Sequence, residues 1–244
     1  MANRDPEMLL REGLSRLCGT DDPAVSEKML LFMDKVLEKN QYMNLTAITD
    51  PEDFVVRHFL DSVLLYDTPV FREAETVVDV GTGAGFPGIP LAILCPDKQF
   101  LLMDSLNKRI LFLEEACREL GLDNVRCLHS RAEDMGQDEE YRERFDMCVS
   151  RAVAKLSVLS EYCLPLVRPG GCFVAYKSGM ENLSEAKRAL KLLGGELTGI
   201  RNFPRLPGNL SFIQLDHRLV FIRKRDITPR KYPRKAGTPA KEPL

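Results

Sequence analysis

Apolar residues recur at helical spacing through the first 70 positions of the chain. The pattern covers three segments, at 6–17, 24–40 and 51–66. Asp22 and Pro23 supply a cap and a first-turn proline for the second segment. The stretch 42–46 has no apolar period and is expected to be an ordered connector. We therefore predict an N-terminal helical subdomain, residues 1–70, which covers the main sheet or forms one wall of a substrate cleft.

From Thr76 onward the pattern changes to short apolar runs that alternate with amphipathic segments. The runs predict strands near 76–80, 99–104, 124–129, 145–150, 171–176, 196–203 and 214–223. The segments between them predict helices near 88–95, 107–120, 132–142, 155–165 and 181–193. This alternation favours an α/β fold, with a mostly parallel, doubly wound sheet in a main domain at 71–223. The last two strands are joined by the loop 204–209 without a helix, so they are expected to pair antiparallel.

The composition is that of a globular protein whose 244 residues are 44% hydrophobic and 29% charged. No run approaches the roughly 20 apolar residues of a membrane-spanning helix, and the first ten residues lack a signal-peptide pattern. The seven cysteines form no C-x-x-C pair, so we expect buried, reduced thiols rather than disulfides or metal ligands. A cytoplasmic monomer with no metal and no membrane partner is expected.

The net charge of −2 hides an asymmetry between the body and the C-terminus. Residues 223–244 hold eight basic residues against two acidic ones, a balance of +6, so the remainder carries −8. The tail at 224–244 has four prolines and no apolar period, so it is expected to be extended or disordered when alone. A basic tail on an acidic body indicates a polyanionic partner. The alternative is a solvated surface tail.

The candidate chemistry centres on one glycine-rich stretch. A β-branched run ends in Asp79, and Gly81, Gly83 and Gly85 then alternate before an apolar segment begins. The order of strand, glycine turn and helix is typical of α/β proteins that bring bare backbone close to a nucleotide-like ligand. We therefore assign these four residues to a cofactor cradle.

The same stretch matches the dinucleotide fingerprint G-x-G-x-x-G, but its other residues argue against a pyrophosphate. Pro87 and Pro90 remove two N–H donors from the helix start, and Phe86 is bulky where a phosphate would approach. S-adenosylmethionine has no phosphate and loses less from these substitutions. A nicotinamide-linked dehydrogenase is a distant alternative, since the chain also lacks a convincing hydride-transfer histidine.

Polar residues at three further strand ends complete the predicted pocket. Asp104 ends the second strand, where it can accept hydrogen bonds from ribose hydroxyls or, alternatively, cap the next helix. Glu133 follows the third strand, where it can read the adenine amino group. Arg151 follows the fourth strand, where the reactive methyl group should point. An arginine beside a cationic sulfonium implies a nearby phosphate or carboxylate; alternatively, Arg131 and Arg151 pair with Glu133 or Glu161.

Several strings together resemble one family, the bacterial small-subunit (16S) ribosomal RNA guanine-N7 methyltransferases, also called glucose-inhibited division protein B. The strings are Asn44-Leu45-Thr46, His58–Ser62, Asp79–Gly88, Asp104–Arg109, Arg131–Glu133, Ser150–Ala152 and Thr228–Pro239. The resemblance covers nearly the whole chain. It implies the class I S-adenosylmethionine-dependent methyltransferase fold, which is Rossmann-like with seven strands and an antiparallel last strand, here with an N-terminal helical extension. It also implies cofactor contacts from Gly81, Phe86, Ala132, Glu133 and Arg151.

The resemblance implies methyl transfer from S-adenosylmethionine to N7 of a guanine in 16S RNA, naked or within the 30S subunit. N7 has an in-plane lone pair and is unprotonated at neutral pH, so no general base is required. Catalysis would then rest on positioning, with Arg151 as the candidate residue. The alternatives are a methyltransferase of another RNA or of a protein, and a non-catalytic ribosome-assembly factor that binds RNA.

Basic residues around the cofactor mouth and in the tail are expected to hold the RNA. The candidates are His58, Lys108, Arg109, Arg131, Lys177, Arg230, Lys231, Arg234 and Lys235.

Overall fold

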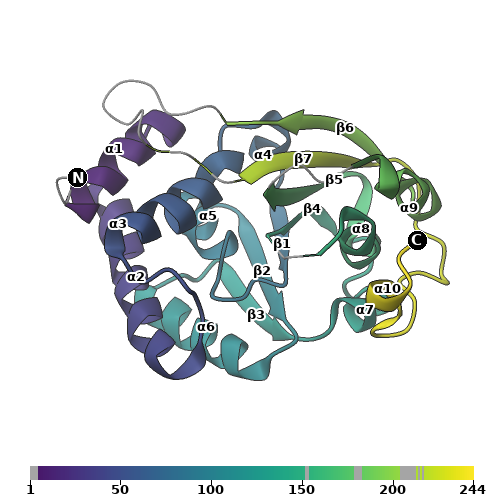
Figure 1. Cartoon of the computed structure of the whole chain (residues 1–244), viewed down its shortest axis with the longest axis horizontal. Coiled ribbons are helices and arrows are strands. Elements are labelled where there is room, and N and C mark those ends of the chain that lie inside the picture. The colour runs from purple at the N-terminus through teal and green to yellow at the C-terminus, as the bar shows by residue number, and fades with distance from the viewer. Residues whose placement is uncertain (1–4, 152–153, 179–182, 204–212, 214, 216) are drawn as a thin grey trace.

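A computed structural model describes residues 5–151, 154–178, 183–203, 213, 215 and 217–244, and its centre is a twisted seven-stranded sheet (Figure 1). The strands are β1 (Thr76–Val80), β2 (Gln99–Asp104), β3 (Val125–His129), β4 (Phe145–Ser150), β5 (Val167–Ser178), β6 (Gly195–Arg201) and β7 (His217–Lys224). Their order is β3-β2-β1-β4-β5-β7-β6. The pairs among β1 to β5 are parallel, whereas β7 is antiparallel to β5 and to β6. The predicted sheet and its antiparallel last strand are confirmed; positions 204–209, 214 and 216 lie outside the described residues.

The register of the parallel strands brings their carboxyl ends to one edge. Val80 pairs with Met103, and Asp104 pairs with His129. Ser150 at the end of β4 donates a hydrogen bond from Oγ to the Val80 carbonyl oxygen at 2.8 Å. The residues that follow β1 to β4 therefore meet at one place, which is where open α/β sheets bind ligands.

Alternate residues along each strand face two separate apolar cores, because successive side chains of a strand point to opposite faces. Val77 faces the core under the N-terminal helices, and Val78 faces the other one. The first face is covered by α5 (Gly88–Leu94) and α6 (Asn107–Leu120), with the N-terminal helices outside them. The second face is covered by α7 (Ala132–Met135), α8 (Leu156–Cys163) and α9 (Lys187–Leu193), with short 3₁₀ turns at Leu164–Leu166 and Leu183–Ala186.

The N-terminal helices are α1 (Pro6–Cys18), α2 (Pro23–Met43), α3 (Pro51–Phe54) and α4 (Pro69–Arg72). Asp5, Asp22 and Asp50 each cap a helix that begins with proline. The helix predicted over 51–66 is not regular: α3 continues into a π-helical segment at Val55–Leu60 and a 3₁₀ turn at Val63–Leu65. Such segments often occur at functional sites, and this one carries His58. The predicted connector is shorter than expected, because α2 continues to Met43.

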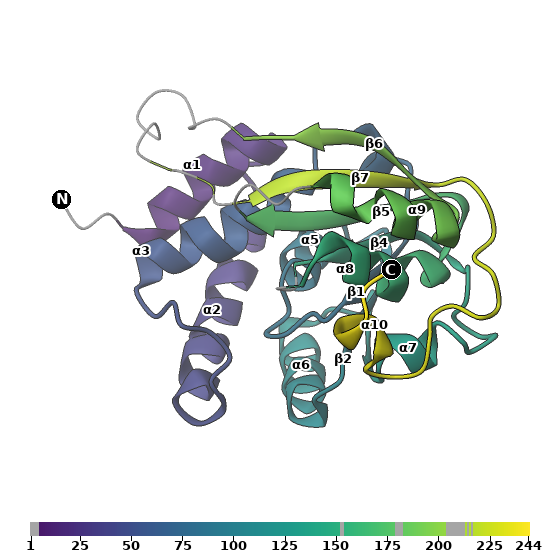
Figure 2. The ribbon, with the colours of Figure 1, turned by 45° about the vertical axis from the view of Figure 1, so that its right-hand side comes forward.

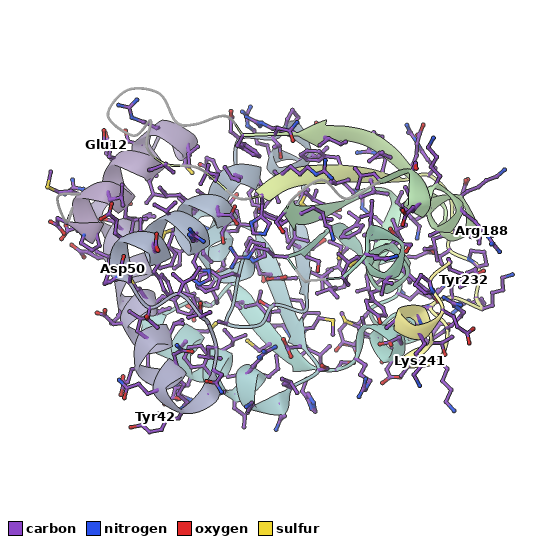
Figure 3. All side chains as sticks on the ribbon, in the orientation of Figure 1. Glu12, Tyr42, Asp50, Arg188, Tyr232 and Lys241 are labelled. Atoms are coloured by element: carbon purple, nitrogen blue, oxygen red, sulfur yellow. The ribbon has the colours of Figure 1, made fainter. Side chains whose placement is uncertain are left out.

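The segment after β7 folds back onto the body, so within the whole chain it is ordered; the expectation for the tail when alone stays a prediction. Figures 1 and 2 show the tail beside α7 and α8, where it ends in α10 (Thr238–Lys241). Arg142 is buried and donates hydrogen bonds to the carbonyl oxygens of Thr228 at 2.6 Å and Tyr232 at 2.8 Å. Figure 3 shows Tyr232 and Lys241 at the end of the molecule opposite Glu12 and Asp50.

A second departure from the predicted helices lies where the tail docks. The helix expected over 132–142 ends at Met135. At the next position, a Cβ on Gly136 would lie 2.7 Å from Pro233 Cγ of the tail. The residues from Gly136 to Glu143 form turns instead, and these turns carry Arg142 into the tail.

Candidate active site

The glycine stretch forms a tight loop between β1 and α5, as predicted. Gly81, Gly83 and Gly85 all adopt positive φ, at 72°, 62° and 102°. This backbone region disfavours residues with a Cβ. At Gly85 a Cβ would also lie within 3.0 Å of Phe32, Ile89 and Leu113.

Asp79 holds this loop from inside the protein. Its Oδ2 accepts hydrogen bonds from Thr82 Oγ1 at 2.8 Å and from the Gly88 N–H at 3.0 Å, while its Oδ1 is buried with no hydrogen-bond partner among the described residues. Burial outweighs these two hydrogen bonds and raises the pKa of Asp79 to about 7. Asp79 therefore acts as a brace for the cradle, and it does not line the cavity described below.

The start of α5 has no free backbone donors to offer a phosphate. The Gly88 N–H is used by Asp79, the Ile89 N–H donates to the Gly85 carbonyl oxygen at 2.8 Å, and Pro90 has none. A pyrophosphate at a helix N-terminus needs several of these donors. The geometry of this loop therefore disfavours a dinucleotide.

A cavity of about 320 Å³ opens beside the loop, at the carboxyl ends of β1, β2 and β3. Its lining is mostly apolar with a few polar groups, as in sites for small cofactors. The lining residues are Val80, Gly81, Met103, Ser105, Ser130, Arg131, Ala132, Glu133, Ala154, Leu159, Tyr162, Gly237 and Ala240. A mostly apolar slot with one buried carboxylate fits an adenosine group. Among the predicted cofactor residues, the cavity brings together Gly81, Ala132 and Glu133.

Glu133 is the buried carboxylate of this cavity. It lies in the first turn of α7 and is 6% exposed. Its Oε1 accepts a hydrogen bond from the Gly237 N–H of the tail at 2.8 Å. Its Oε2 makes no hydrogen bond within the described part of the chain, so one carboxylate oxygen stays available for a ligand.

Asp104, which was predicted to bind the ribose, accepts three hydrogen bonds from within the protein. Its Oδ1 accepts from the Leu106 N–H at 2.9 Å, at the start of α6, which is the predicted capping alternative. Its Oδ2 accepts from the Gly83 N–H at 3.0 Å and from Arg109 Nη1 at 3.2 Å. Asp104 thus ties the glycine loop to α6. Its contact with a ribose stays a prediction.

Arg151 lies on the other side of the loop, where it joins the N-terminal subdomain to β4. Its Nη1 donates to Asp61 Oδ2 at 3.1 Å, and its Nη2 donates to His58 Nδ1 at 3.1 Å. Asp61 is 1% exposed, and it also accepts from His217 Nδ1 at 2.8 Å. The neutralising carboxylate that Arg151 was expected to need is Asp61, and neither Glu133 nor Glu161 is its partner.

The charge state of His58 follows from its partners. A guanidinium can only donate, so Nδ1 of His58 accepts from Arg151, and Nε2 carries the ring proton and donates to Thr46 Oγ1 at 2.8 Å. Burial and the neighbouring Arg151 lower the pKa of His58 to about 3. His58 is therefore neutral, with both ring nitrogens occupied.

Phe86 connects this network to the glycine loop. The His58 ring stacks on Phe86 at 4.4 Å between centroids, and the Arg151 guanidinium carbon lies 5.1 Å from the Phe86 centroid. Phe54 and Phe59 meet the same ring edge-on. Phe86 is buried and does not line the cavity, so its contact with the cofactor stays a prediction.

Some of the basic residues predicted to bind RNA are exposed, and others are bound to groups of the protein. Lys108, Arg131, Lys231 and Lys235 are exposed. Others are bound within the protein: Arg109 to Asp104, Lys177 to the Ala154 carbonyl oxygen, Arg230 to Glu139 and Arg234 to Glu161. Lys177 and His58 are also buried, and their contact with RNA stays a prediction.

Sequence reasoning missed Asp61, His217 and the tail residues that line the cavity. The position of Asp61 had a signal, because it follows His58 by three residues and so shares its helical face. His217 and Gly237 had none, because long-range packing brings them to the site.

Solved structures of other proteins share this fold. A mutant of the 16S rRNA (adenine(1408)-N(1))-methyltransferase from Catenulisporales acidiphilia matches with a TM-score of 0.51 and 16% identity, over 64% of this chain and 87% of that chain. An O-methyltransferase family protein from Burkholderia thailandensis matches with a TM-score of 0.50 and 13% identity, over 88% and 76%. These matches show the fold class, which is that of the class I S-adenosylmethionine-dependent methyltransferases.

The chain belongs to the family described as rRNA small subunit methyltransferase G, whose model matches residues 25–206. Relatives support this over nearly the full length. The Ribosomal RNA small subunit methyltransferase G of Alkaliphilus metalliredigens is 44% identical over 98% of this chain and 99% of its own length. That of Clostridium tetani is 49% identical over 87% and 88%. The family predicted from the motifs is confirmed.

The described residues contain neither a membrane-spanning helix nor a cluster of metal ligands. No helix there is long and apolar enough to cross a membrane. No group of three or more His, Cys, Asp or Glu side chains within the same residues could hold a metal ion. All seven cysteines are free thiols, five of them buried, in line with the prediction.

Proposed function

We propose that the protein transfers a methyl group from S-adenosylmethionine to N7 of a guanine in 16S ribosomal RNA. The family and the names of its relatives support the RNA substrate. The observation that carries the choice of N7 is the state of the polar groups beside the glycine loop. His58 has both ring nitrogens engaged, and Asp61 is buried and shared by two basic side chains, so neither is exposed as a base for an exocyclic amine.

His58 and Asp61 are two side chains here that could act as a general base. His58 has its Nδ1 lone pair bound to Arg151 and its Nε2 proton directed at Thr46. Asp61 Oδ2 is shared by Arg151 and His217, and Asp61 Oδ1 is buried. Guanine N7 has a free lone pair and needs no deprotonation before it attacks. A site in which His58 and Asp61 are engaged in this way is therefore sufficient for attack by N7.

S-adenosylmethionine, when bound, supplies an electrophilic methyl group on a cationic sulfonium. Gly81, Ala132 and Glu133 would hold its adenosine part in the apolar cavity. Asp79 and the positive-φ glycines fix the loop between this cavity and Phe86. Catalysis then comes from alignment of the reacting atoms, which can contribute on the order of 7–11 kcal/mol.

Arg151 is the residue best placed to orient the RNA. Its side chain is only 11% exposed and is fixed by Asp61 and His58. An arginine that reads guanine normally binds O6 and N7 together, but N7 must stay free here. Arg151 should therefore bind O6 alone or a phosphate. Arg131, which lines the cavity, and Lys108, in the first turn of α6, are exposed and would add phosphate contacts. This substrate also places the protein in the cytoplasm.

Methyl transfer assays on naked 16S RNA and on 30S subunits, with the modified base mapped, test this proposal. Reduction with borohydride followed by aniline cleaves RNA specifically at N7-methylguanine, and we expect one such cleavage. Methylation of an exocyclic amine or of a protein would contradict it. RNA binding without methyl transfer would indicate an assembly factor instead. A comparison of rates on the two substrates would identify the assembly state that is recognised.

A further inference from the structure

The C-terminal tail forms part of the wall of the cofactor cavity. Gly237 and Ala240 line it together with Gly81 and Glu133, which come from the ends of β1 and β3. Figures 1 and 2 both show α10 directly beside α7, the helix that carries Glu133. The tail therefore reaches a site about a hundred residues earlier in the chain.

The tail meets the cavity through one defined hydrogen bond. The Gly237 N–H donates to Glu133 Oε1 at 2.8 Å, and Glu133 is almost fully buried. Within the described residues this is the bond that fixes the carboxylate, and it leaves Oε2 directed to other partners. Because a carboxylate is planar, the hydrogen bond to Oε1 also fixes the direction of Oε2. A fixed acceptor is suited to recognising an amino group.

A set of buried contacts keeps the tail in place. The backbone N–H, Nε and Nη2 of Arg234 donate to the fully buried Glu161 of α8, at distances of 2.7 to 2.8 Å. Arg142 donates to the carbonyl oxygens of Thr228 and Tyr232. Such charge-assisted and bidentate contacts are among the strongest in proteins.

These contacts also account for the charge asymmetry of the sequence. Buried Lys224 pairs with Glu143 at 3.0 Å, Arg234 pairs with Glu161, and Arg230 pairs with Glu139. The acidic body is thus the anionic partner of at least three basic residues of the C-terminal segment. Only part of the positive charge is left for a nucleic acid.

We propose that the tail is a functional part of the cofactor site, in which Gly237 positions Glu133 to recognise the adenine amino group. This inference rests on the proposed function, because it takes S-adenosylmethionine as the ligand. Gly237 is a positioning residue, since it acts on the cofactor through Glu133. The tail then determines the affinity and the base selectivity for the cofactor.

Gly237 allows a precise test. Its φ is +82°, and a Cβ added there would have no atom within 4 Å, so Gly237→Ala introduces backbone strain without a steric clash. Gly121, which ends α6, has φ of +62° and equally open surroundings. Gly121→Ala is therefore a matched control with the same kind of strain away from the cavity. Calorimetric titration of the full-length proteins with S-adenosylhomocysteine measures the effect.

We expect Gly237→Ala to bind S-adenosylhomocysteine about tenfold more weakly than wild type, and Gly121→Ala to bind like wild type. The second ligand is the inosine analogue, whose 6-oxo group cannot donate to Glu133. Wild type should prefer the adenine form, and Gly237→Ala should lose most of that preference. General destabilisation would not change the ratio of the two affinities. A variant truncated after Ala236 retains Arg234 and should behave like Gly237→Ala.

The possible outcomes separate the two proposals. If wild type binds the adenine ligand and both tail variants match it in affinity and preference, the role of the tail is wrong while the proposed function stands. If wild type binds neither ligand, the proposed function fails and this inference fails with it. If Gly121→Ala weakens binding as much as Gly237→Ala, the effect is general strain and the positioning role is excluded.

Discussion

Arg151 and Asp61 form a buried pair in which each residue fixes the other. Asp61 is 1% exposed and has Arg151 and His217 as its partners. Removal of one member of a buried ion pair typically costs about 3–5 kcal/mol, because the remaining charge loses its partner. Arg151→Ala alone would therefore reduce activity and stability together, and the two effects need to be separated.

The double variant Asp61→Asn/Arg151→Ala separates them. Its neutral amide can still accept from His217, so we expect thermal stability close to wild type and clearly above that of Arg151→Ala. Methyl transfer should remain at least about a hundredfold below wild type, because the RNA base has lost its orienting cation. Thermal unfolding and single-turnover rates on saturating RNA measure the two quantities. Wild-type turnover in the double variant would show that Arg151 has no part in catalysis.

Asp79 should make stability depend on pH in the direction opposite to most carboxylates. Burial raises its pKa from the ordinary 3.8 to about 7. Between these values the folded protein binds the proton more tightly than the unfolded chain. The contribution of Asp79 to the free energy of unfolding is therefore complete below about pH 4 and is lost as the pH rises through about 7.

Asp79→Asn removes this titration, since its amide is neutral at every pH. We expect the stability of wild type relative to the variant to fall between pH 5 and 8, by no more than a few kcal/mol. Urea unfolding at several pH values in that range measures the difference. A constant difference between the two proteins would show that Asp79 is ionised throughout.

Among the segments of the chain, the C-terminal tail differs most between the role predicted from sequence and the contacts seen in the structure. Its composition predicted an RNA-binding arm, but Arg230 and Arg234 pair with acidic residues of the body. Lys231 and Lys235 are exposed and, among the described residues, form no ion pair. Truncation of the whole tail would uncover buried Lys224, so point substitutions are the better probe.

We expect Lys231→Ala/Lys235→Ala to reduce the salt dependence of RNA binding. Each lost phosphate contact lowers the slope of log K against log salt by about 0.7–0.9. Arg11→Ala/Lys28→Ala removes two exposed cations from α1 and α2 at the other end of the molecule, and it is the control for net charge. Filter binding at several salt concentrations gives the slopes. Equal slopes for both double variants would assign no RNA contact to the tail.

Features set by local sequence were predicted, and features set by long-range contacts were not. The strands and α6 were predicted to within a few residues, because their periodicity is local and strong. The glycine loop and Glu133 were also found, since turn chemistry and strand ends are readable in sequence. The Asp61–Arg151–His217 network and the contact of Gly237 with Glu133 were not, because they join residues 90 to 156 positions apart. The irregular helix after Pro51 was missed because tertiary packing overrides propensity there.

At the scale of the whole molecule, the N-terminal helices and the methyltransferase domain share one apolar core. Phe32 of α2 and Phe54 of α3 contact Phe86 of the glycine loop, with ring centroids 5.5 and 5.8 Å apart. The same continuous core contains Val77 of β1 and Leu113 of α6. The boundary proposed near residue 70 therefore divides the chain by secondary structure, while the packing across it is that of a single unit.

This packing leads to a prediction about unfolding. A subdomain that shares its core with the main sheet should not unfold separately, so we expect one cooperative transition in calorimetry, with a calorimetric enthalpy equal to the van't Hoff enthalpy. Phe86→Ala removes the ring that joins the two parts and should lower the free energy of unfolding by about 3–5 kcal/mol. It should also split or broaden the transition. Phe71→Ala is the control, because Phe71 is equally buried but packs away from the loop, against Tyr66 and Lys98. Two separate transitions in the wild-type protein would show instead that the helical subdomain is independent and free to move over the site.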